Sequence, residues 1–106
     1  MTTPDYWPTI DGLVDWLDER NGRPEPELTL RVLKLSEEVG EVAQAWIGFL
    51  GQNPRKGVTH RRVDVADELC DVIVTASVAL ASIVEDPASH FDKKLRQIAA
   101  ARPRTP

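Results

Sequence analysis

Apolar residues recur every three or four positions along most of the chain, which is the spacing of one face of an α-helix. The first such segment runs from about residue 9 to about residue 20, and the second from about 27 to 50. A third covers about 59–84 and a fourth about 87–101. No segment shows the alternation that is typical of a half-buried strand. The pattern therefore predicts a single all-α domain of four helices over residues 1–106.

Helix-breaking residues separate these segments. The stretch 21–26 reads NGRPEP and the stretch 51–57 reads GQNPRKG, and both have the glycine and proline content of loops. Thr9 and Thr59 are candidate N-caps of the first and third helices, because a hydroxyl can accept a backbone N–H of the first turn. Asp86 followed by a proline is a strong start signal for the fourth helix.

The apolar residues of the two long helices form regular rows. The row of the second helix is Leu28, Val32, Leu35, Val39, Val42, Trp46 and Phe49. The row of the third helix is Val65, Leu69, Val72, Ala76, Ala79 or Leu80, and Ile83. Apolar residues also occupy the opposite side of the third helix, and a helix that is apolar all round is buried all round. In a four-helix monomer the other three helices cannot easily bury the third helix on every side. We therefore expect an oligomer whose interface includes this helix.

Composition narrows the classes of function. The net charge of −4, from 17 acidic and 13 basic residues, argues against a nucleic-acid binder that relies on a basic surface. The single cysteine allows no intrachain disulfide, and the first residues lack the basic and apolar regions of a signal peptide. The uncharged stretch 72–84 is too short to span a bilayer. We therefore expect a soluble, cytoplasmic protein without nucleic-acid or membrane partners.

Two acidic motifs lie on the two long helices. Glu38 and Glu41 are three residues apart, as are Glu68 and Asp71, so each pair lies on one face of its helix. At about 100° per residue, both pairs fall at the same angles, about 60° and 120°, from the apolar row of their own helix. If the helices pack as neighbours, the four carboxylates share a cleft at one edge of the contact. A single pair is usually solvated surface charge, but two pairs at matching angles indicate a site.

The types of residue in this cluster narrow the choice of cation. Four carboxylates brought together without a cation repel one another. No histidine follows either motif at the spacing of di-iron proteins, and no group of cysteines and histidines has the spacing of a zinc site. Oxygen ligands alone favour Mg²⁺ or Mn²⁺, with Ca²⁺ as a non-productive occupant. Such a cation suits a substrate that carries phosphate groups.

The motif Glu37-Glu38-x-x-Glu41 followed by Glu68-x-x-Asp71 resembles the signature of the MazG-like, all-α nucleoside triphosphate pyrophosphohydrolases. The resemblance covers most of the chain and implies a four-helix, MazG-like fold that assembles as a homodimer or homotetramer. It implies hydrolysis of a nucleoside or deoxynucleoside triphosphate to the monophosphate and pyrophosphate, in nucleotide-pool housecleaning. In that family the two motifs supply the Mg²⁺ ligands, which here are Glu38, Glu41, Glu68 and Asp71. The leading Glu37 would orient or deprotonate the attacking water.

Basic and aromatic residues offer further contacts for such a substrate. Arg55 and Lys56 in the second loop and Lys93 on the fourth helix are candidates to hold the phosphates, although exposed charge is the commoner role of such residues. Trp46 is a candidate to stack on the base, although its place in the apolar row favours core packing. Two tryptophans of the first helix are further candidates to line a base pocket: Trp7 and Trp16.

Two other functions stay open. Phosphoribosyl-ATP pyrophosphohydrolase has a similar acidic motif, but there the second half runs on into a stretch containing Tyr-His, whereas here Asp71 is followed by Val72-Ile73-Val74-Thr75. The second alternative is a non-catalytic helical interaction module whose acidic edge binds metal weakly or not at all. Such a module would neither release pyrophosphate nor gain stability from Mg²⁺.

Overall fold

Four helices make up most of residues 5–103, the part of the chain that the computed structural model describes. Helix α1 spans Trp7–Asn21, α2 spans Glu25–Leu50, α3 spans Arg62–Ile83 and α4 spans Pro87–Ala100. Residues 5–103 contain no strand, so the predicted all-α class and the number of helices are confirmed. The expectation that the chain has no signal peptide concerns its first residues, and residues 1–4 lie outside the described part. None of the four helices has both the length and the hydropathy that crossing a bilayer requires.

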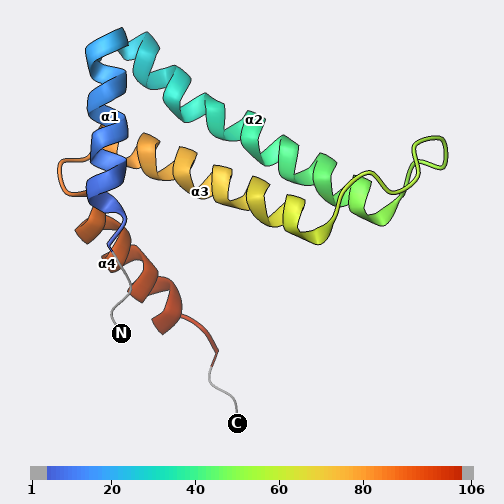
Figure 1. The fold of residues 1–106 in the computed structure, drawn as a ribbon. Coiled ribbons are helices and arrows are strands. Elements are labelled where there is room, and N and C mark those ends of the chain that lie inside the picture. Colours follow the sequence, from blue (N-terminus) through green and yellow to red (C-terminus); the bar gives the residue numbers. More distant parts are fainter. Residues whose placement is uncertain (1–4, 104–106) are drawn as a thin grey trace.

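Helices α2 and α3 form a long antiparallel hairpin, and α1 crosses the end of this hairpin near the start of α2 (Figure 1). Helix α4 begins beside α1 and then runs away from the hairpin. Near its start, the ring of Phe91 meets Trp7 edge to face, with the ring centroids 6.3 Å apart. Within one chain the four helices therefore do not close into a bundle, and most of α4 lies apart from the hairpin.

Two of the predicted helix starts are wrong. Thr59 does not cap α3, because the Asp64 carboxylate accepts the backbone N–H of Arg61 at 2.8 Å and the helix begins at Arg62. The first helix starts two residues before the predicted cap Thr9. The predicted start of α4 is confirmed by the cap at Asp86, whose Oδ1 accepts the backbone N–H three residues later at 3.2 Å.

The contact between α2 and α3 lies one residue away from the predicted apolar rows at several positions. On α2 the buried residues are Arg31, Glu38 and Ala45. The predicted row members that follow them are exposed: Val32, Val39 and Trp46. On α3, Leu69 and Ile83 are likewise exposed. The prediction that Trp46 packs in the core is therefore wrong, and much apolar surface of the hairpin is left uncovered within one chain.

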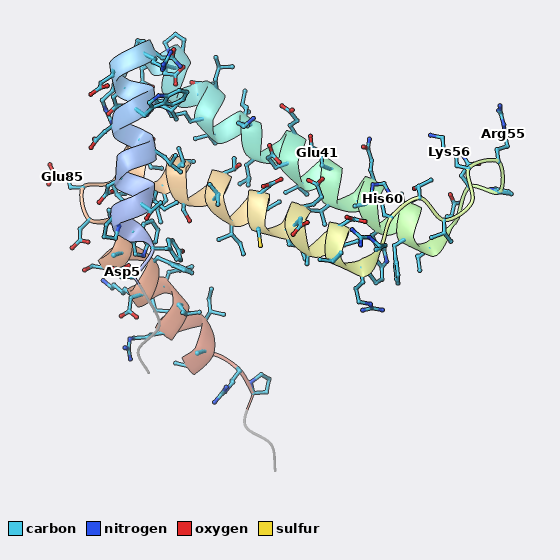
Figure 2. All side chains as sticks on the ribbon, in the orientation of Figure 1. Asp5, Glu41, Arg55, Lys56, His60 and Glu85 are labelled. Carbon is cyan, nitrogen blue, oxygen red and sulfur yellow. The ribbon has the colours of Figure 1, made fainter. Side chains whose placement is uncertain are left out.

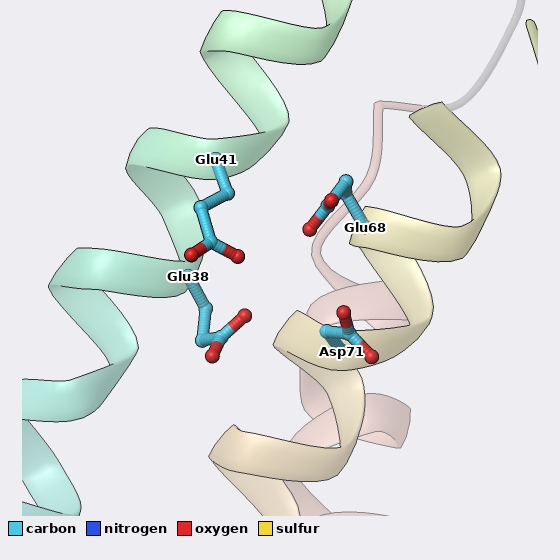
Figure 3. A group of neighbouring side chains, drawn as sticks. All are labelled: Glu38, Glu41, Glu68 and Asp71. Atoms are coloured by element: carbon cyan, nitrogen blue, oxygen red, sulfur yellow. The ribbon is translucent and has the colours of Figure 1, made fainter. Parts of the chain in front are cut away.

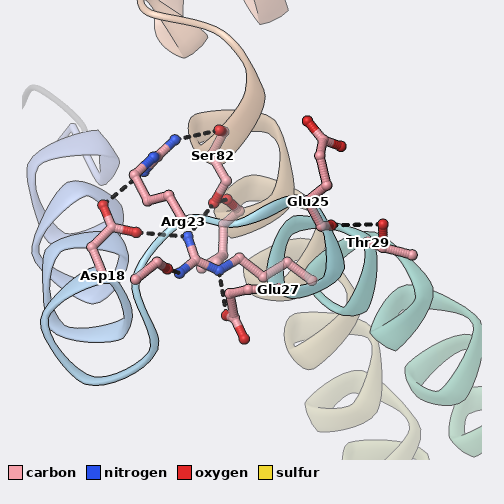
Figure 4. A network of polar contacts seen from close by, with 9 residues as sticks. Asp18, Arg23, Glu25, Glu27, Thr29 and Ser82 are labelled. Atoms are coloured by element: carbon pink, nitrogen blue, oxygen red, sulfur yellow. Dashed lines mark hydrogen bonds and ion pairs between the residues drawn. The ribbon is translucent and has the colours of Figure 1, made fainter.

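A buried arginine joins three helices at the end of the hairpin where α1 crosses it. The Arg31 side chain is 4% exposed, and its guanidinium donates to Glu27 at 2.8 Å and to Asp18 at 2.9 Å. It also donates to the Ser82 hydroxyl at 3.1 Å and to the carbonyl of Gly22 at 3.2 Å. Figure 4 shows Asp18, Glu27 and Ser82 gathered around this point. These bonds explain why a charged residue, rather than the neighbouring valine, lies in the contact.

Charge pairing in this network shifts the ionisation of its members. Partial burial works against ionisation of Asp18, but hydrogen bonds from Arg23 and Arg31 outweigh it and hold the pKa of Asp18 below its ordinary value. Burial also opposes the charge of Arg31, and the two carboxylates raise its pKa above the ordinary value. The network is therefore charged at neutral pH and ties α1 to both long helices.

Candidate metal centre

Four carboxylates converge in the middle of the α2–α3 hairpin. Each of Glu38, Glu41, Glu68 and Asp71 offers one oxygen, and these four oxygens lie within 4.8 Å of one another. Figure 3 shows two of the side chains reaching across from α2 and two from α3. The antiparallel pairing of the helices places the two motifs opposite each other, so the structure brings together all four residues that the sequence singled out as metal ligands.

The cluster lies deeper than the sequence predicted. Glu38 and Glu68 occupy the contact between the helices rather than its edge, with apolar residues one turn before and after each of them: Leu35, Val42, Val65 and Val72. Glu38 is only 9% exposed, while Asp71 at the other side is open to solvent. The centre therefore has a dry inner side and a wet outer side, through which a ligand can approach.

Two carboxylate oxygens at this centre have no hydrogen-bond partner. The Oε2 atoms of Glu38 and Glu68 are buried and receive no donor from the described residues. Burying a charged oxygen without a donor or a cation is costly, so native structures rarely leave one unsatisfied. The only ion pair of the cluster with a described residue is with Lys34, whose Nζ lies 3.6 Å from Glu38 Oε1. One exposed lysine leaves most of the negative charge uncompensated.

The ionisation of Glu38 responds to this surplus of negative charge. Burial raises the pKa of Glu38 above its ordinary value, and the charge of Glu41 adds to the effect. Lys34 acts in the opposite direction, and Asp71 contributes a smaller increase. A divalent cation among the four carboxylates would remove this penalty.

The donor set fits a hard divalent cation. All four ligand groups are carboxylates, which suit Mg²⁺ or Mn²⁺, and the group contains no histidine or cysteine. Two oxygens on one Mg²⁺ at about 2.1 Å lie at most about 4.2 Å apart. Neighbouring ligands at 90° lie closer, at about 3.0 Å, so oxygens that now lie within 4.8 Å of one another would draw together by up to about 1–2 Å to share one ion.

Glu37, the predicted catalytic residue, does not belong to the group of four. It is exposed on α2 and follows Glu41 by about 40° around the helix, on the wet side of the centre. That position allows contact with a water at the rim, so its role stays a prediction.

The basic residues predicted to hold phosphates lie elsewhere in the chain. Arg55 and Lys56 are exposed in the α2–α3 loop, and Figure 2 shows them at the end of the hairpin, apart from Glu41. Lys93 is exposed on α4, which runs away from the hairpin. The structure does not bring any of the three to the carboxylates within one chain. The basic residue that does lie at the cluster is Lys34, which sequence reasoning missed. Its position four residues before Glu38 is the signal that could have found it.

The tryptophans have three different surroundings. Trp46 packs on Phe49 with ring centroids 5.1 Å apart, and the guanidinium of Arg62 lies over both rings, 5.7 Å from Trp46 and 5.1 Å from Phe49. Trp7 packs against α4. Trp16 lines a pocket between α1, α2 and α3. The lining of this pocket includes neither Trp7 nor Trp46, the other two candidates for base stacking.

Comparisons with protein-family models, with curated proteins and with solved structures found no match for the chain. The candidate centre therefore rests on its own geometry and chemistry.

Proposed function

We propose that this protein is a Mg²⁺-dependent nucleoside triphosphate pyrophosphohydrolase that serves nucleotide-pool housecleaning. The observation that supports the proposal is the convergence of four carboxylates, two of which carry buried oxygens that receive no donor from residues 5–103. A purely structural acidic patch gains nothing from burying such oxygens, whereas a cation site needs them. Mn²⁺ is an alternative occupant because it accepts the same ligands.

In the proposed reaction the protein mainly positions the cation, the triphosphate and the attacking water. A bound divalent cation neutralises phosphate charge and lowers the pKa of a coordinated water. Glu38 and Glu68 would hold the cation from the dry side, and Glu41 and Asp71 from the side that a triphosphate can reach. Glu37 would orient the attacking water and accept its proton as the oxygen bonds to the α-phosphorus. The bond from that phosphorus to the bridging oxygen then breaks, which releases pyrophosphate.

We also infer that the protein works as a homodimer or homotetramer. The accessible surface is 8412 Å², against about 5,900 Å² for a compact monomer of this mass. The radius of gyration is 17.3 Å, against about 13 Å for a compact domain of this length. For a dimer the surplus of about 2,500 Å² per chain amounts to about 5,000 Å² in total, at the upper end of the range of about 2,000–5,000 Å² that obligate homo-oligomers bury. The exposed apolar residues of α2, α3 and α4 form part of this surplus.

The experiment that tests the proposed function measures pyrophosphate release with Mg²⁺ from a panel of ribo-, deoxy- and damaged nucleoside triphosphates that includes phosphoribosyl-ATP. Glu41→Gln and Asp71→Asn should abolish release without loss of helix content. Matched controls are Glu19→Gln and Asp11→Asn, which remove exposed carboxylates of α1 outside the cluster. Full activity in both cluster variants would show that the site is wrong.

A second measurement separates the enzyme from a non-catalytic module. Mg²⁺ should raise the unfolding temperature of the wild type and of the two controls, but not of Asp71→Asn. A wild type that turns over no nucleotide and gains no stability from Mg²⁺ would favour an interaction module. Turnover of phosphoribosyl-ATP alone would favour the other pyrophosphohydrolase family.

A further inference from the structure

A small pocket lies next to the acidic cluster, where α1 crosses the hairpin. Its volume is about 220 Å³, and its walls are almost entirely apolar. Each of the three helices contributes to the lining: Trp16 and Leu17 from α1, Arg31 and Lys34 from α2, Thr75 and Val78 from α3. Ligand pockets usually measure about 300–1,000 Å³, so this one holds a single planar ring system rather than a whole nucleotide.

The pocket and the cluster are neighbours along both long helices. Lys34 lines the pocket and also pairs with Glu38 of the cluster. Thr75 follows Asp71 by four residues, which places it one turn further along the same face of α3. At 1.5 Å per residue, this turn separates the two by about 6 Å along the helix axis. A ribose can span that step between a ring in the pocket and a phosphate at the cluster.

The walls of the pocket are held in place before any ligand binds. Arg31 is fixed by its bonds to α1, α2 and α3, so it forms a rigid part of the lining. Trp16 is 53% exposed, and the Arg20 guanidinium lies 4.6 Å from the centre of its ring. One guanidinium covers only one face of an indole, so Arg20 leaves part of the Trp16 ring free for other contacts.

We propose that this pocket receives the base of the nucleotide, with Trp16 stacking on the ring while the cluster binds the phosphates. The proposal rests on the proposed function and names how the same site recognises its substrate. Stacking accepts any base, because every base has a π-face.

The lining also predicts which bases the pocket accepts. Four of the five N–H donors of Arg31 are taken by Asp18, Glu27, Ser82 and the carbonyl of Gly22, and Lys34 is paired with Glu38. Besides the indole N–H of Trp16, Thr75 supplies the remaining polar group of the lining. A wall of this kind cannot strongly reject a ring that differs only in its hydrogen-bonding groups. We therefore expect dCTP and dUTP to bind within about a hundredfold of each other.

The test compares a ligand that has a base with one that has none. Binding of dCTP and of inorganic tripolyphosphate is measured by calorimetry in Ca²⁺, a non-productive cation. Trp16→Ala should weaken dCTP binding by about 5- to 100-fold and leave tripolyphosphate binding unchanged. Trp16→Phe, which keeps an aromatic face, should recover most of the dCTP affinity. In a variant whose only tryptophan is Trp16, dCTP should change the indole emission and tripolyphosphate should not.

The outcomes separate this inference from the proposed function. A wild type that binds neither ligand overturns both. Binding of both ligands with an equal effect of Trp16→Ala on each, or with no effect, overturns the base pocket alone. If Trp46→Ala, rather than Trp16→Ala, weakens binding of dCTP but not of tripolyphosphate, the base lies at the opposite end of the cluster. The pocket assignment is then wrong.

Discussion

Replacing Arg31 by methionine should destabilise the protein by about 2–3 kcal/mol. Methionine keeps much of the aliphatic volume but removes the guanidinium that joins α1, α2 and α3. Removing one partner of a fully buried ion pair costs about 3–5 kcal/mol, because the other charge is left without compensation. Here the side chains of Asp18 and Glu27 keep 25% and 15% of their surface, and Asp18 also keeps its bond to Arg23 at 2.7 Å. We therefore expect less than the full penalty.

The expected loss converts into a shift of the unfolding temperature. An unfolding entropy of about 2.1 cal/mol/K per residue gives about 0.22 kcal/mol/K for 106 residues. The midpoint should therefore fall by about 9–14 °C. Thermal unfolding followed by circular dichroism, at one fixed protein concentration, measures this shift.

The matched control is Arg96→Met, which makes the same change in an exposed pair with Asp92 on α4. This variant should unfold at the wild-type temperature, because exposed ion pairs contribute little. If Arg31→Met lowers the midpoint by less than about 3 °C, or by no more than the control, the network does not hold α1 against the hairpin.

Four further outcomes follow from the structure. The raised pKa of Glu38 means that the folded protein binds a proton more readily than the unfolded chain, so stability in a chelator should fall as the pH rises above the ordinary pKa of a glutamate. Calorimetric unfolding at several pH values should find that Glu38→Gln or Mg²⁺ weakens this dependence of stability on pH. An unchanged dependence in the variant would refute its attribution to Glu38. Gly48→Ala should cost about 1–3 kcal/mol in urea unfolding, since the new methyl group overlaps the ring of His60. Gly40→Ala, which has open space around it, should instead stabilise the helix by about 1 kcal/mol, and a loss there would point to a neighbouring chain. Sedimentation should give a mass well above the 11.8 kDa of one chain, and a monomer at every concentration would contradict the inferred oligomer.

The local features of the fold were predictable because they depend on residues close together in the sequence. The period of the apolar residues gives four helices, and the aspartate before Pro87 gives the start of the last one. The three-residue spacing of Glu38 with Glu41, and of Glu68 with Asp71, requires only helical geometry to place each pair on one face. Antiparallel pairing of the two helices then brings the motifs together.

The line of contact between the long helices was not predictable from the period alone. Two adjacent rows run along α2, and the row with Val32 and Val39 is more apolar than the row with Arg31 and Glu38. The choice between them is made by partners distant in the sequence, since Ser82 and Asp18 meet Arg31 only after three helices have assembled. Charged residues can be buried when such partners exist, and a pattern of hydrophobicity does not reveal them.

The burial of Glu38 and Glu68 inside the helix contact has a consequence for local opening of the hairpin. One end of the hairpin is held by Arg31, and the other by the bond from the backbone N–H of Thr59 to the carbonyl of Gly48 at 2.9 Å. Between them, like charges occupy the place where paired helices usually gain their packing energy. Backbone amides in this middle stretch should exchange with deuterium sooner than those at the ends. A divalent cation would act there as a latch, slowing exchange in the middle of α2 and α3 while leaving the two ends almost as they were.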